Sequence, residues 1–542
     1  MWPIRRADEG AVARLSAEAR IAPALARVLW LRGVRDAGGV ERWLRPSVDH
    51  FYPSNLLPDF APAVARIRRA VSDGEGILIW GHDDLDGMTS VVVLARVLSD
   101  MRAVVYHYIP TRGKERHGLN PELAATYRSR GARLVITVDC GITNRRQVES
   151  LRESGMDVIV TDHHEVMESM PDAVARVDPK RPDSVYPYRG LAGAGVALKL
   201  AMGLAEESLG LSAREFLSVQ PQLQAVAVLG TIADRVPLVD ENRTLVATGL
   251  RSLETTAQPA IRAVLDHLGA GRGLTVSRLV ADLMPLFASA NGDDGVERIL
   301  HSTPEQARDW VRDLAARSVD WRAEAERAFA IAEQSVSVGD GIVVVRDRSL
   351  SLRALGFCAS RLKDRYQLPA IVMGWRGDAW VGECRGIDGV SLMDLLTASS
   401  RFFIDYGGHK KAAGFSILVE SAEEFVRSAE QYAHENFAGQ VEREDVVQAD
   451  AQLPIAEFTF SCRELAPFGE GNQHPLFLSG SERLLPSGDG WTAESRPDIR
   501  FRAPQRGARI APGERLQVLY SVDDDGTPVI VDTSVPSDGA VG

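Results

Sequence analysis

The feature that most constrains the fold is a regular alternation of short β-branched runs with helical patterns. Four such runs are predicted strands: Ile77–Trp80, Val104–Ile109, Leu134–Val138 and Val158–Val160. A helical pattern follows each run, the clearest being the apolar stretch Val91–Leu98. Strands that alternate with helices form parallel sheets covered on both faces, and short, continuously apolar strands suit that environment. We therefore predict an α/β fold built on a doubly covered parallel sheet.

The rest of the chain divides into further units. A chain of 542 residues is too long for one domain, since roughly 150 residues are typical of each. A helical region follows the parallel sheet, and a second, smaller α/β pattern begins near Gly341. The C-terminal part is rich in strands and turns, as in a small oligonucleotide-binding (OB) barrel. The predicted units are an N-terminal segment (1–50), the parallel-sheet domain (51–250), a helical connector (251–335), a second α/β domain (336–435) and an OB-like nucleic-acid-binding domain (440–542).

Composition excludes several classes of protein. Hydrophobic residues make up 45% and charged residues 25% of the chain, as in ordinary globular proteins. Because no apolar stretch follows the N-terminus and no apolar run reaches about 18 residues, we expect neither a secretory signal nor a membrane segment, and the scattered cysteines predict a reducing, cytoplasmic setting. The cysteines lie far apart, which argues against disulfides and zinc ribbons. Because the net charge is −12, nucleic acid would have to bind in a local basic channel.

Polar residues that suit metal binding follow the predicted strands. The carboxyl ends of parallel strands meet at one edge of a sheet, and carboxylates with imidazoles favour Mn²⁺ or Mg²⁺ over structural zinc. Some of these residues also have an ordinary explanation: Asp86-Gly87 is typical of a turn, and Asp139 could cap a helix. Together they suffice for two ions that share a carboxylate, an arrangement that hydrolyses phosphate esters. The candidate ligands are His82, Asp84, Asp86, Asp139, His163 and Asp234.

These motifs also carry a family resemblance. Thr161-Asp162-His163-His164 matches the signature of the DHH phosphoesterases, and Gly407-Gly-His-Lys-Lys-Ala-Ala-Gly414 resembles a motif of their DHHA1 domain. Supporting matches follow in the family's order, including Val138-Asp-Cys-Gly-Ile142 and Leu465-Ala-Pro-Phe-Gly-Glu-Gly-Asn472. The layout from about Phe51 onward resembles that of the RecJ-like exonucleases, which are single-strand-specific members of this family.

The resemblance implies a role for each matched residue. The six candidate ligands would bind two Mn²⁺ or Mg²⁺ ions, with Asp139 bridging them. His164 would lie beside the scissile phosphate, and Asp162 would orient a neighbouring imidazole. The predicted glycine-rich loop Gly407–Lys411 and two arginines would contact the nucleic acid. The implied substrate contacts are Arg112, Arg385, Gly408, His409 and Lys410.

The activity that the resemblance implies is metal-dependent hydrolysis of single-stranded DNA from an end. The direction would be 5′→3′, with release of 5′-mononucleotides in DNA repair and recombination. The implied partners are single-stranded DNA, a single-strand-binding protein and a helicase, and the chain would be a monomer. Two alternatives stay open: a phosphodiesterase for short oligonucleotides or cyclic dinucleotides, and an inactive single-strand-binding scaffold. The complete ligand set argues against the scaffold, and the barrel argues against the small-substrate enzyme.

Three sites in the sequence depart from the family pattern. His82 replaces the usual leading aspartate of the first motif, Arg116-His117 replaces Gly-Tyr, and Glu383 replaces a serine two residues before Arg385. Imidazole is a competent ligand for Mn²⁺, so we expect the metal site to be kept, whereas the other two changes bear on substrate length and end preference. A basic run in the predicted barrel is either a strand contact or a solvated loop; it comprises Arg500, Arg502, Arg506 and Arg509.

Overall fold

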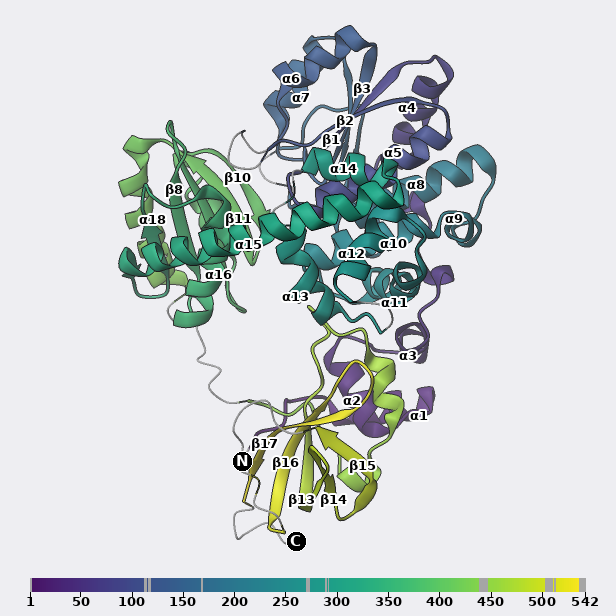
Figure 1. Ribbon diagram of the computed structural model, residues 1–542, viewed down its shortest axis with the longest axis vertical. Helices are drawn as coiled ribbons and strands as arrows, with labels where there is room; N and C mark the ends of the chain where they lie inside the picture. Colours follow the sequence, from purple (N-terminus) through teal and green to yellow (C-terminus); the bar gives the residue numbers. More distant parts are fainter. Residues whose placement is uncertain are drawn as a thin grey trace.

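The computed structural model places a large α/β domain and its helical extension at the top, a smaller α/β domain beside them and a β-barrel below (Figure 1). Arg112, Arg116 and His117 lie outside the part of the chain that it describes. The described residues are 2–111, 115, 118–166, 169–269, 273–287, 290, 292–437, 447–502, 510 and 513–535.

A parallel sheet forms the centre of the first domain. Its strands are β1 (Gly76–Gly81), β2 (Val104–Tyr108), β3 (Ala132–Val138), β4 (Asp157–Thr161) and β5 (Ala175–Val177). They lie in the order β2-β1-β3-β4-β5, and all neighbours are parallel. Along β1 the side chains alternate between two cores, Ile77 and Ile79 entering one and Leu78 and Trp80 the other. Both faces of the sheet are therefore covered, which confirms the predicted α/β class.

Helices cover the two faces of this sheet unequally. They are α4 (Phe60–Ser72), α5 (Leu85–Asp100), α6 (Pro121–Thr126), α7 (Arg145–Glu153), α8 (Gly193–Leu209), α9 (Ala213–Val219), α10 (Pro221–Ala233) and α11 (Asp240–Thr255). The core on the side of Ile77 and Ile79 contains residues of α4, α5 and α8 to α11, whereas the core on the side of Leu78 and Trp80 contains residues of α6 and α7. The thicker helical layer supports α5, α8 and α10, which carry residues of the candidate site.

The helical region that follows belongs to two domains. Its helices are α12 (Pro259–His267), α13 (Val276–Phe287), α14 (Gly292–His301) and α15 (Pro304–Gln334). The first core continues through these helices as far as Leu314 in α15. The C-terminal half of α15 buries Ala325 and Phe329 in a core of the second domain. With 31 residues, α15 is roughly 46 Å long, so one rigid helix is anchored in both domains.

The second domain is built on a six-stranded mixed sheet in the order β10-β11-β9-β8-β7-β6. Its strands and helices are β6 (Val336–Val338), β7 (Val343–Arg346), α16 (Leu355–Tyr366), β8 (Ala370–Trp375), β9 (Trp380–Arg385), α17 (Leu392–Ala398), β10 (Phe403–His409), β11 (Ala412–Ile417) and α18 (Ala422–Asn436). One core lies under α17 and α18, and the other lies under α16 and the end of α15. This domain is therefore also a covered α/β sheet.

The prediction of a glycine-rich loop at Gly407–Lys411 is wrong in form, because most of this segment is a β-hairpin. Gly408 pairs with Ala413 and His409 with Ala412, which leaves Lys410-Lys411 in the turn. Gly408 has a φ of +137°, and a Cβ there would lie 2.5 Å from the Ala412 carbonyl oxygen, so only glycine suits this position. The hairpin holds His409 at the end of a strand rather than on a loop.

The C-terminal strands form an OB-like barrel. They are β12 (Ala451–Gln452), β13 (Phe477–Ser487), β14 (Gly490–Ala493), β15 (Arg496–Arg502), β16 (Arg515–Val522) and β17 (Pro528–Ser534). Their order is β12-β13-β14-β15-β17-β16, and a further pairing of β13 with β16 closes the ring. The N-terminal helices α1 (Glu9–Ala19), α2 (Pro23–Leu31) and α3 (Ala37–Leu44) pack against the barrel and share its core. In Figure 1 they are the purple helices beside the yellow strands.

A buried arginine joins the barrel to the first domain. Arg243 of α11 is 2% exposed and donates hydrogen bonds to the carbonyl oxygens of Trp43 (2.9 Å) and Leu465 (2.9 Å). It also donates to the carbonyls of Glu464 and Ala466, and its guanidinium lies 4.6 Å from the Trp43 ring centroid. One side chain of the first domain's last helix thus contacts the N-terminal helix α3 and the segment that leads into the barrel.

Two expectations from composition can be compared with the structure. Among the described residues no single helix is long and apolar enough to cross a membrane, and only the bent pair α9 and α10 reaches that length and composition when taken together. The four cysteines are buried and form no disulfide. Burial raises the pKa of the Cys140 and Cys384 thiols, so neither is a reactive thiolate at neutral pH.

Candidate active site

Three adjacent strands of the first domain end at the candidate site. β3 pairs with β1 on one side and with β4 on the other, so the loops after these strands meet at one edge of the sheet. His82 follows β1, Asp139 follows β3 and His163 follows β4, while Asp234 follows helix α10. Functional groups of open parallel sheets collect at this edge. The structure therefore brings together residues that are up to 152 positions apart in the sequence (82 to 234).

The six candidate ligands form two neighbouring groups. His82, Asp84 and Asp139 offer ligand atoms that all lie within 4.8 Å of one another, and so do Asp86, His163 and Asp234. Asp139 also approaches the second group, with its Oδ1 2.9 Å from His163 Nε2. Each group is the size of a single cation site, and Asp139 lies between them. This is the position that a bridging carboxylate would need.

Asp84 and Asp86 are held by the starts of two helices. Asp84 is the N-cap of α5 and accepts a hydrogen bond from Gly87 N (2.9 Å). Asp86 lies in the first turn of α5, not in an isolated turn, and its carboxylate accepts from the backbone amides of Gly193 (2.7 Å) and Ala194 (2.9 Å) at the start of α8. Helix N-termini stabilise carboxylates. Capping and metal binding are therefore compatible roles for Asp84.

Asp139 does not cap a helix. It has a φ of +57°, and the next helix, α7, starts six residues later with Asn144 as its N-cap. Its side chain is 2% exposed, and a Cβ on Gly193 would lie 2.6 to 2.9 Å from its atoms. The left-handed backbone turns the carboxylate inward, and a glycine opposite gives it room. A structural role as a cap is thereby excluded for Asp139.

The hydrogen bonds of His163 leave its second nitrogen available for a metal. Nδ1 lies 3.0 Å from the Leu191 carbonyl oxygen, which can only accept, so Nδ1 carries the proton and Nε2 has the lone pair. Nε2 faces Asp139 Oδ1 at 2.9 Å, so its lone pair is directed at the carboxyl group that lies between the two ligand groups. His163 Nε2, Asp139 Oδ2 and Asp234 Oδ2 are buried without a hydrogen-bond partner among the described residues. A divalent cation fits this donor set.

The electrostatics of the site also favour a cation. Burial and the charge of Asp84 raise the pKa of Asp86 to about 7. Burial, together with the neighbouring carboxylates, raises the pKa of Asp139 and of Asp234 well above the usual range. Burial lowers the pKa of His163, so its ring is neutral. Without a cation the site carries carboxylates that cannot all ionise, and a divalent ion would supply the missing positive charge.

Asp162 holds His164 beside these ligands. Its Oδ1 lies 2.7 Å from His164 Nδ1 and accepts from the His163 amide, while its Oδ2 accepts from the Ile142 amide (2.9 Å). Burial opposes ionisation of Asp162, but the charge and hydrogen bond of His164 outweigh it and lower the pKa of this carboxyl. Asp162 therefore stays charged and keeps Nδ1 of His164 protonated. The other nitrogen, Nε2, is left to face the cleft.

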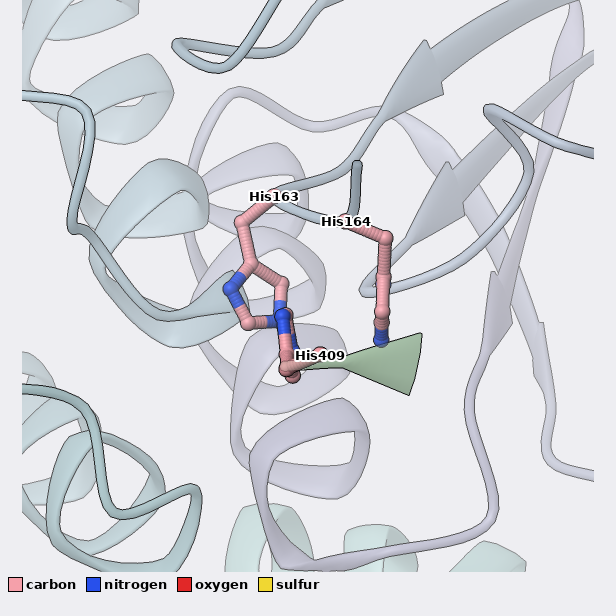
Figure 2. Close-up of side chains that lie close together, drawn as sticks. All are labelled: His163, His164 and His409. Carbon is pink, nitrogen blue, oxygen red and sulfur yellow. The ribbon is translucent and has the colours of Figure 1, made fainter. Parts of the chain in front are cut away.

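The second domain forms the opposite wall of the site. The His409 ring stacks on His164 with centroids 4.6 Å apart at 12° and lies 4.8 Å from the His163 ring. Figure 2 shows His163 and His164 reaching from one loop toward His409 at the tip of a strand of the second domain. A cleft of about 2640 Å³ surrounds them and is lined by both domains, with Arg385, Gly408 and Lys410 among its residues. Arg112 lies outside the described residues.

Comparison with known proteins identifies the family. The N-terminal domain of the DHH family matches residues 76–231, and the DHHA1 domain matches residues 339–435. The single-stranded-DNA-specific exonuclease RecJ of Dickeya dadantii is 34% identical over 494 residues, which cover 85% of this chain and 84% of that protein. The chain belongs to the RecJ family. Escherichia coli RecJ is 31% identical over 519 residues, covering 89% and 87% of the two chains.

Other RecJ proteins agree in sequence or in fold. Bacillus subtilis RecJ is 31% identical over 492 residues, and the match covers 88% of this chain but 61% of that protein. RecJ from Thermus thermophilus, solved in complex with Mn²⁺, shares the fold with a TM-score of 0.76 over 99% of this chain and 80% of that one, at 24% identity. An exonuclease RecJ structure bound to manganese is 27% identical with a TM-score of 0.58, covering 72% of this chain and 97% of that one.

Glu383, one of the departures from the RecJ pattern, changes the setting of Arg385. Its Oε2 lies 3.0 Å from Arg385 Nη1, and both side chains line the cleft. Lys411 in the hairpin turn is paired with Asp388 (2.6 Å) and Glu470 (2.8 Å). Both cations are thus shared with carboxylates of the chain itself, whereas Lys410 has no ion pair among the described residues.

The basic run of the barrel is largely neutralised in this RecJ-family chain. Arg500 pairs with Asp489, and Arg502 pairs with Asp523 and Asp525. Phe501 is buried in the barrel core and cannot stack on a base. Arg506 and Arg509 lie outside the described residues. The described part of this run therefore favours the interpretation as ordinary surface structure.

Sequence reasoning missed two polar residues beside the site, Asp178 and Lys180. They follow β5, whose three residues Ala175–Val177 are too short for a clear strand pattern. Burial and the charge of Asp162 raise the pKa of Asp178 to about 8. Lys180 lies 3.1 Å from His409 Nδ1. The signal that could have located them is their position after the next parallel strand, where β1, β3 and β4 also place functional groups.

Proposed function

We propose that this chain hydrolyses phosphodiester bonds of single-stranded DNA from an end, with two divalent ions, Mn²⁺ or Mg²⁺, as cofactors. The observation that carries the proposal is the pair of ligand groups that meet at Asp139 on the floor of a cleft between two domains. Family membership supports it, since the curated relatives are single-stranded-DNA-specific exonucleases. The complete ligand set argues against an inactive scaffold.

The ligand groups define which residues would hold the ions. His82, Asp84 and Asp139 would hold one, and Asp86, His163 and Asp234 the other, with Asp139 shared. Two such ions supply a hydroxide nucleophile at neutral pH and neutralise charge on the scissile phosphate and leaving oxygen. Burial keeps His163 neutral, the Leu191 carbonyl fixes its proton on Nδ1, and the amides at the start of α8 fix Asp86. These contacts keep ligand lone pairs directed at the site before substrate arrives.

His164 is suited to act on the substrate rather than to bind a metal. Because Asp162 holds the proton on Nδ1, Nε2 of the neutral ring is an acceptor, and only the imidazolium form of His164 can donate a hydrogen bond or a proton from Nε2 to a phosphate oxygen or to the leaving oxygen. Asp162 remains ionised and stabilises the positive charge of a protonated His164 ring. The stacked His409 covers one face of the His164 ring, which restricts the orientations that the imidazole can adopt.

The finer features of the reaction are part of the same proposal. We infer a 5′→3′ direction with release of 5′-mononucleotides, and roles in DNA repair and recombination in the cytoplasm. We also infer that the chain acts as a monomer with a single-strand-binding protein and a helicase as partners. The resemblance to RecJ-like enzymes supports these inferences. Activity on short oligonucleotides or cyclic dinucleotides is the alternative that the experiment must separate.

The test is hydrolysis of DNA labelled separately at each end, as single strand and as blunt duplex, with Mn²⁺ or with EDTA. We expect degradation of the single strand only, beginning at the 5′ end and requiring the metal. Asp139→Ala should lower the rate by more than the roughly 100-fold that loss of an outer-shell contact costs. Asp266→Asn, an exposed carboxylate paired with Arg262 on α12, is the control and should keep full activity.

Three outcomes would contradict the proposal. Undiminished activity of the Asp139→Ala variant would exclude the shared-carboxylate site. Equal degradation of blunt duplex and single strand would exclude single-strand selectivity. Activity confined to dinucleotides would favour the small-substrate enzyme.

A further inference from the structure

A hydrogen bond between the two α/β domains ends at the candidate site. Lys180, in the loop after β5 of the DHH domain, places its Nζ 3.1 Å from Nδ1 of His409 at the end of β10 in the DHHA1 domain. The Lys180 side chain is 16% exposed, and it forms a loose ion pair with Glu165, whose Oε1 lies 3.8 Å from Nζ. Its backbone amide is fixed by Asp178 Oδ1 at 2.8 Å. Lys180 is therefore held in place against His409.

This contact selects one tautomer of His409. A lysine ammonium has three donors and no acceptor, so Nδ1 of His409 must supply a lone pair. In a neutral imidazole the proton then lies on Nε2. The opposite tautomer would direct an N–H at the ammonium, which is repulsive, and would leave an acceptor on Nε2.

Within the described part of the chain, no hydrogen bond competes for the Nε2 atom of His409. It is buried and has no hydrogen-bond partner among the described residues. The ring packs against the imidazoles of both His163 and His164, at 4.8 Å and 4.6 Å between centroids, and Figure 2 shows the three side chains close together. An N–H donor at this place can be satisfied by an oxygen that enters the cleft.

We propose that Lys180 is a positioning residue for the hydrolysis, because it holds His409 in the form that carries its proton on Nε2 and seats the ring against His164. In this form the DHHA1 domain presents an N–H donor to a non-bridging oxygen of the phosphate bound at the metal site. The inference rests on the proposed function, since the acceptor is a phosphate of the DNA. Without Lys180 the acceptor tautomer becomes populated, and it repels the same oxygen.

The first experiment detects the tautomer directly. The full-length chain is labelled with ¹⁵N-histidine in the presence of Mg²⁺, and the His409 signals are assigned by their loss in His409→Ala. The wild-type spectrum should show a protonated Nε2 and an unprotonated Nδ1. Lys180→Met keeps the length of the side chain but removes the donor, so the two nitrogens should shift toward an average of the two tautomers. An unchanged His409 spectrum in Lys180→Met would overturn the proposal.

The second experiment measures turnover of single-stranded DNA. Lys180→Met should lower kcat by about 10- to 100-fold while KM stays within about two-fold, since the lost donor acts on the reacting phosphate and not on the rest of the strand. Lys180→Arg, which retains a donor, should recover part of the loss. The double variant of Lys180→Met with His409→Ala should be no slower than His409→Ala alone, because both changes remove one interaction.

A matched lysine provides the control. Lys363 lines the same cleft but pairs with Asp364 at 2.8 Å, so Lys363→Met should change neither the His409 spectrum nor kcat. A specific role for Lys180 would be refuted if the losses in kcat of the two single variants multiply in the double variant. It would also be refuted if Lys363→Met alters the His409 spectrum as strongly as Lys180→Met does. A wild-type chain that shows the tautomer but hydrolyses no DNA would refute the proposed function alone, because the tautomer is measured without turnover.

Discussion

The affinity of the site for Mn²⁺ should rise steeply with pH. Burial and neighbouring carboxylates raise the pKa of three ligands, Asp86, Asp139 and Asp234. A raised carboxyl pKa means that the metal-free protein holds a proton that the ionised ligand must lose before it binds the ion. Lowering the pH therefore stabilises the metal-free form and opposes metal binding, and raising the pH through the shifted pKa values removes this opposition.

The size of the effect follows from the same residues. With a pKa of about 7, Asp86 holds about half a proton at pH 7. Asp139 and Asp234 add to this in the same direction, so binding of the two ions should release more than this half proton. Each proton changes the binding constant about tenfold per pH unit, or about 1.4 kcal/mol. His163 contributes none, because burial lowers its pKa and the ring is already neutral.

Isothermal titration calorimetry can measure both quantities. Titrations of the full-length chain with Mn²⁺ at pH 7, in two buffers with different ionisation enthalpies, give the number of protons released, and titrations at pH 6, 7 and 8 give the slope of affinity. Asp139→Asn should reduce both the number of protons and the affinity, whereas Asp266→Asn should change neither. An affinity that is independent of pH, with equal heats in the two buffers, would refute the reasoning.

The remaining predictions concern strand binding and domain attachment. Lys410→Ala and Arg385→Ala should each weaken binding of a long oligonucleotide and reduce the slope of log affinity against log salt concentration by about 0.7. Turnover of a nitrophenyl nucleotide ester should be retained, and an equal loss of both activities would place these residues in the catalytic centre. Glu383→Gln should instead strengthen oligonucleotide binding, measured in the same titration, because it releases Arg385 from its ion pair. Arg243→Met leaves the Trp43 carbonyl without a partner, which costs about 1–3 kcal/mol. In a denaturant titration followed by a probe in the barrel, the barrel of this variant should detach at a lower denaturant concentration, whereas the unfolding of the parallel sheet should not shift.

Much of the fold could be predicted because the decisive signals are local. The stretches Ile77–Trp80 and Leu134–Ile136 are continuously apolar, so the burial of these strands on two faces is evident from the sequence alone. The three-residue strand Ala175–Val177 carries too little pattern to be found. The glycines near His409 predict a loop, although Gly408 is required by close strand pairing. Propensity rules treat glycine as a loop residue and do not include the neighbouring strand.

In the candidate site, too, the residues with a local sequence signal could be predicted, and the contacts between distant residues could not. His82 and Asp139 could be found because each directly follows a predicted strand, and topology brings such positions together. The contact of Lys180 with His409 joins residues 229 positions apart and depends on how two domains pack. The sequence shows Glu383 only as a carboxylate near Arg385 and does not show that the two side chains form an ion pair. Side-chain geometry across an interface has no periodic signal in a sequence.

The shared core of the barrel and the helices α1–α3 has a consequence for biosynthesis. Residues such as Leu29 and Trp43 are covered by Phe458 and Phe468 and by the barrel strands, which are made roughly 400 residues later. At about 5–20 residues per second, the ribosome needs roughly 20 to 80 s to supply them. During that time the parallel-sheet domain can fold, but the N-terminal helices expose an unpartnered apolar face. A chaperone that binds short apolar helices would therefore be expected to bind this nascent chain at its first 50 residues and to be released only when the barrel strands emerge.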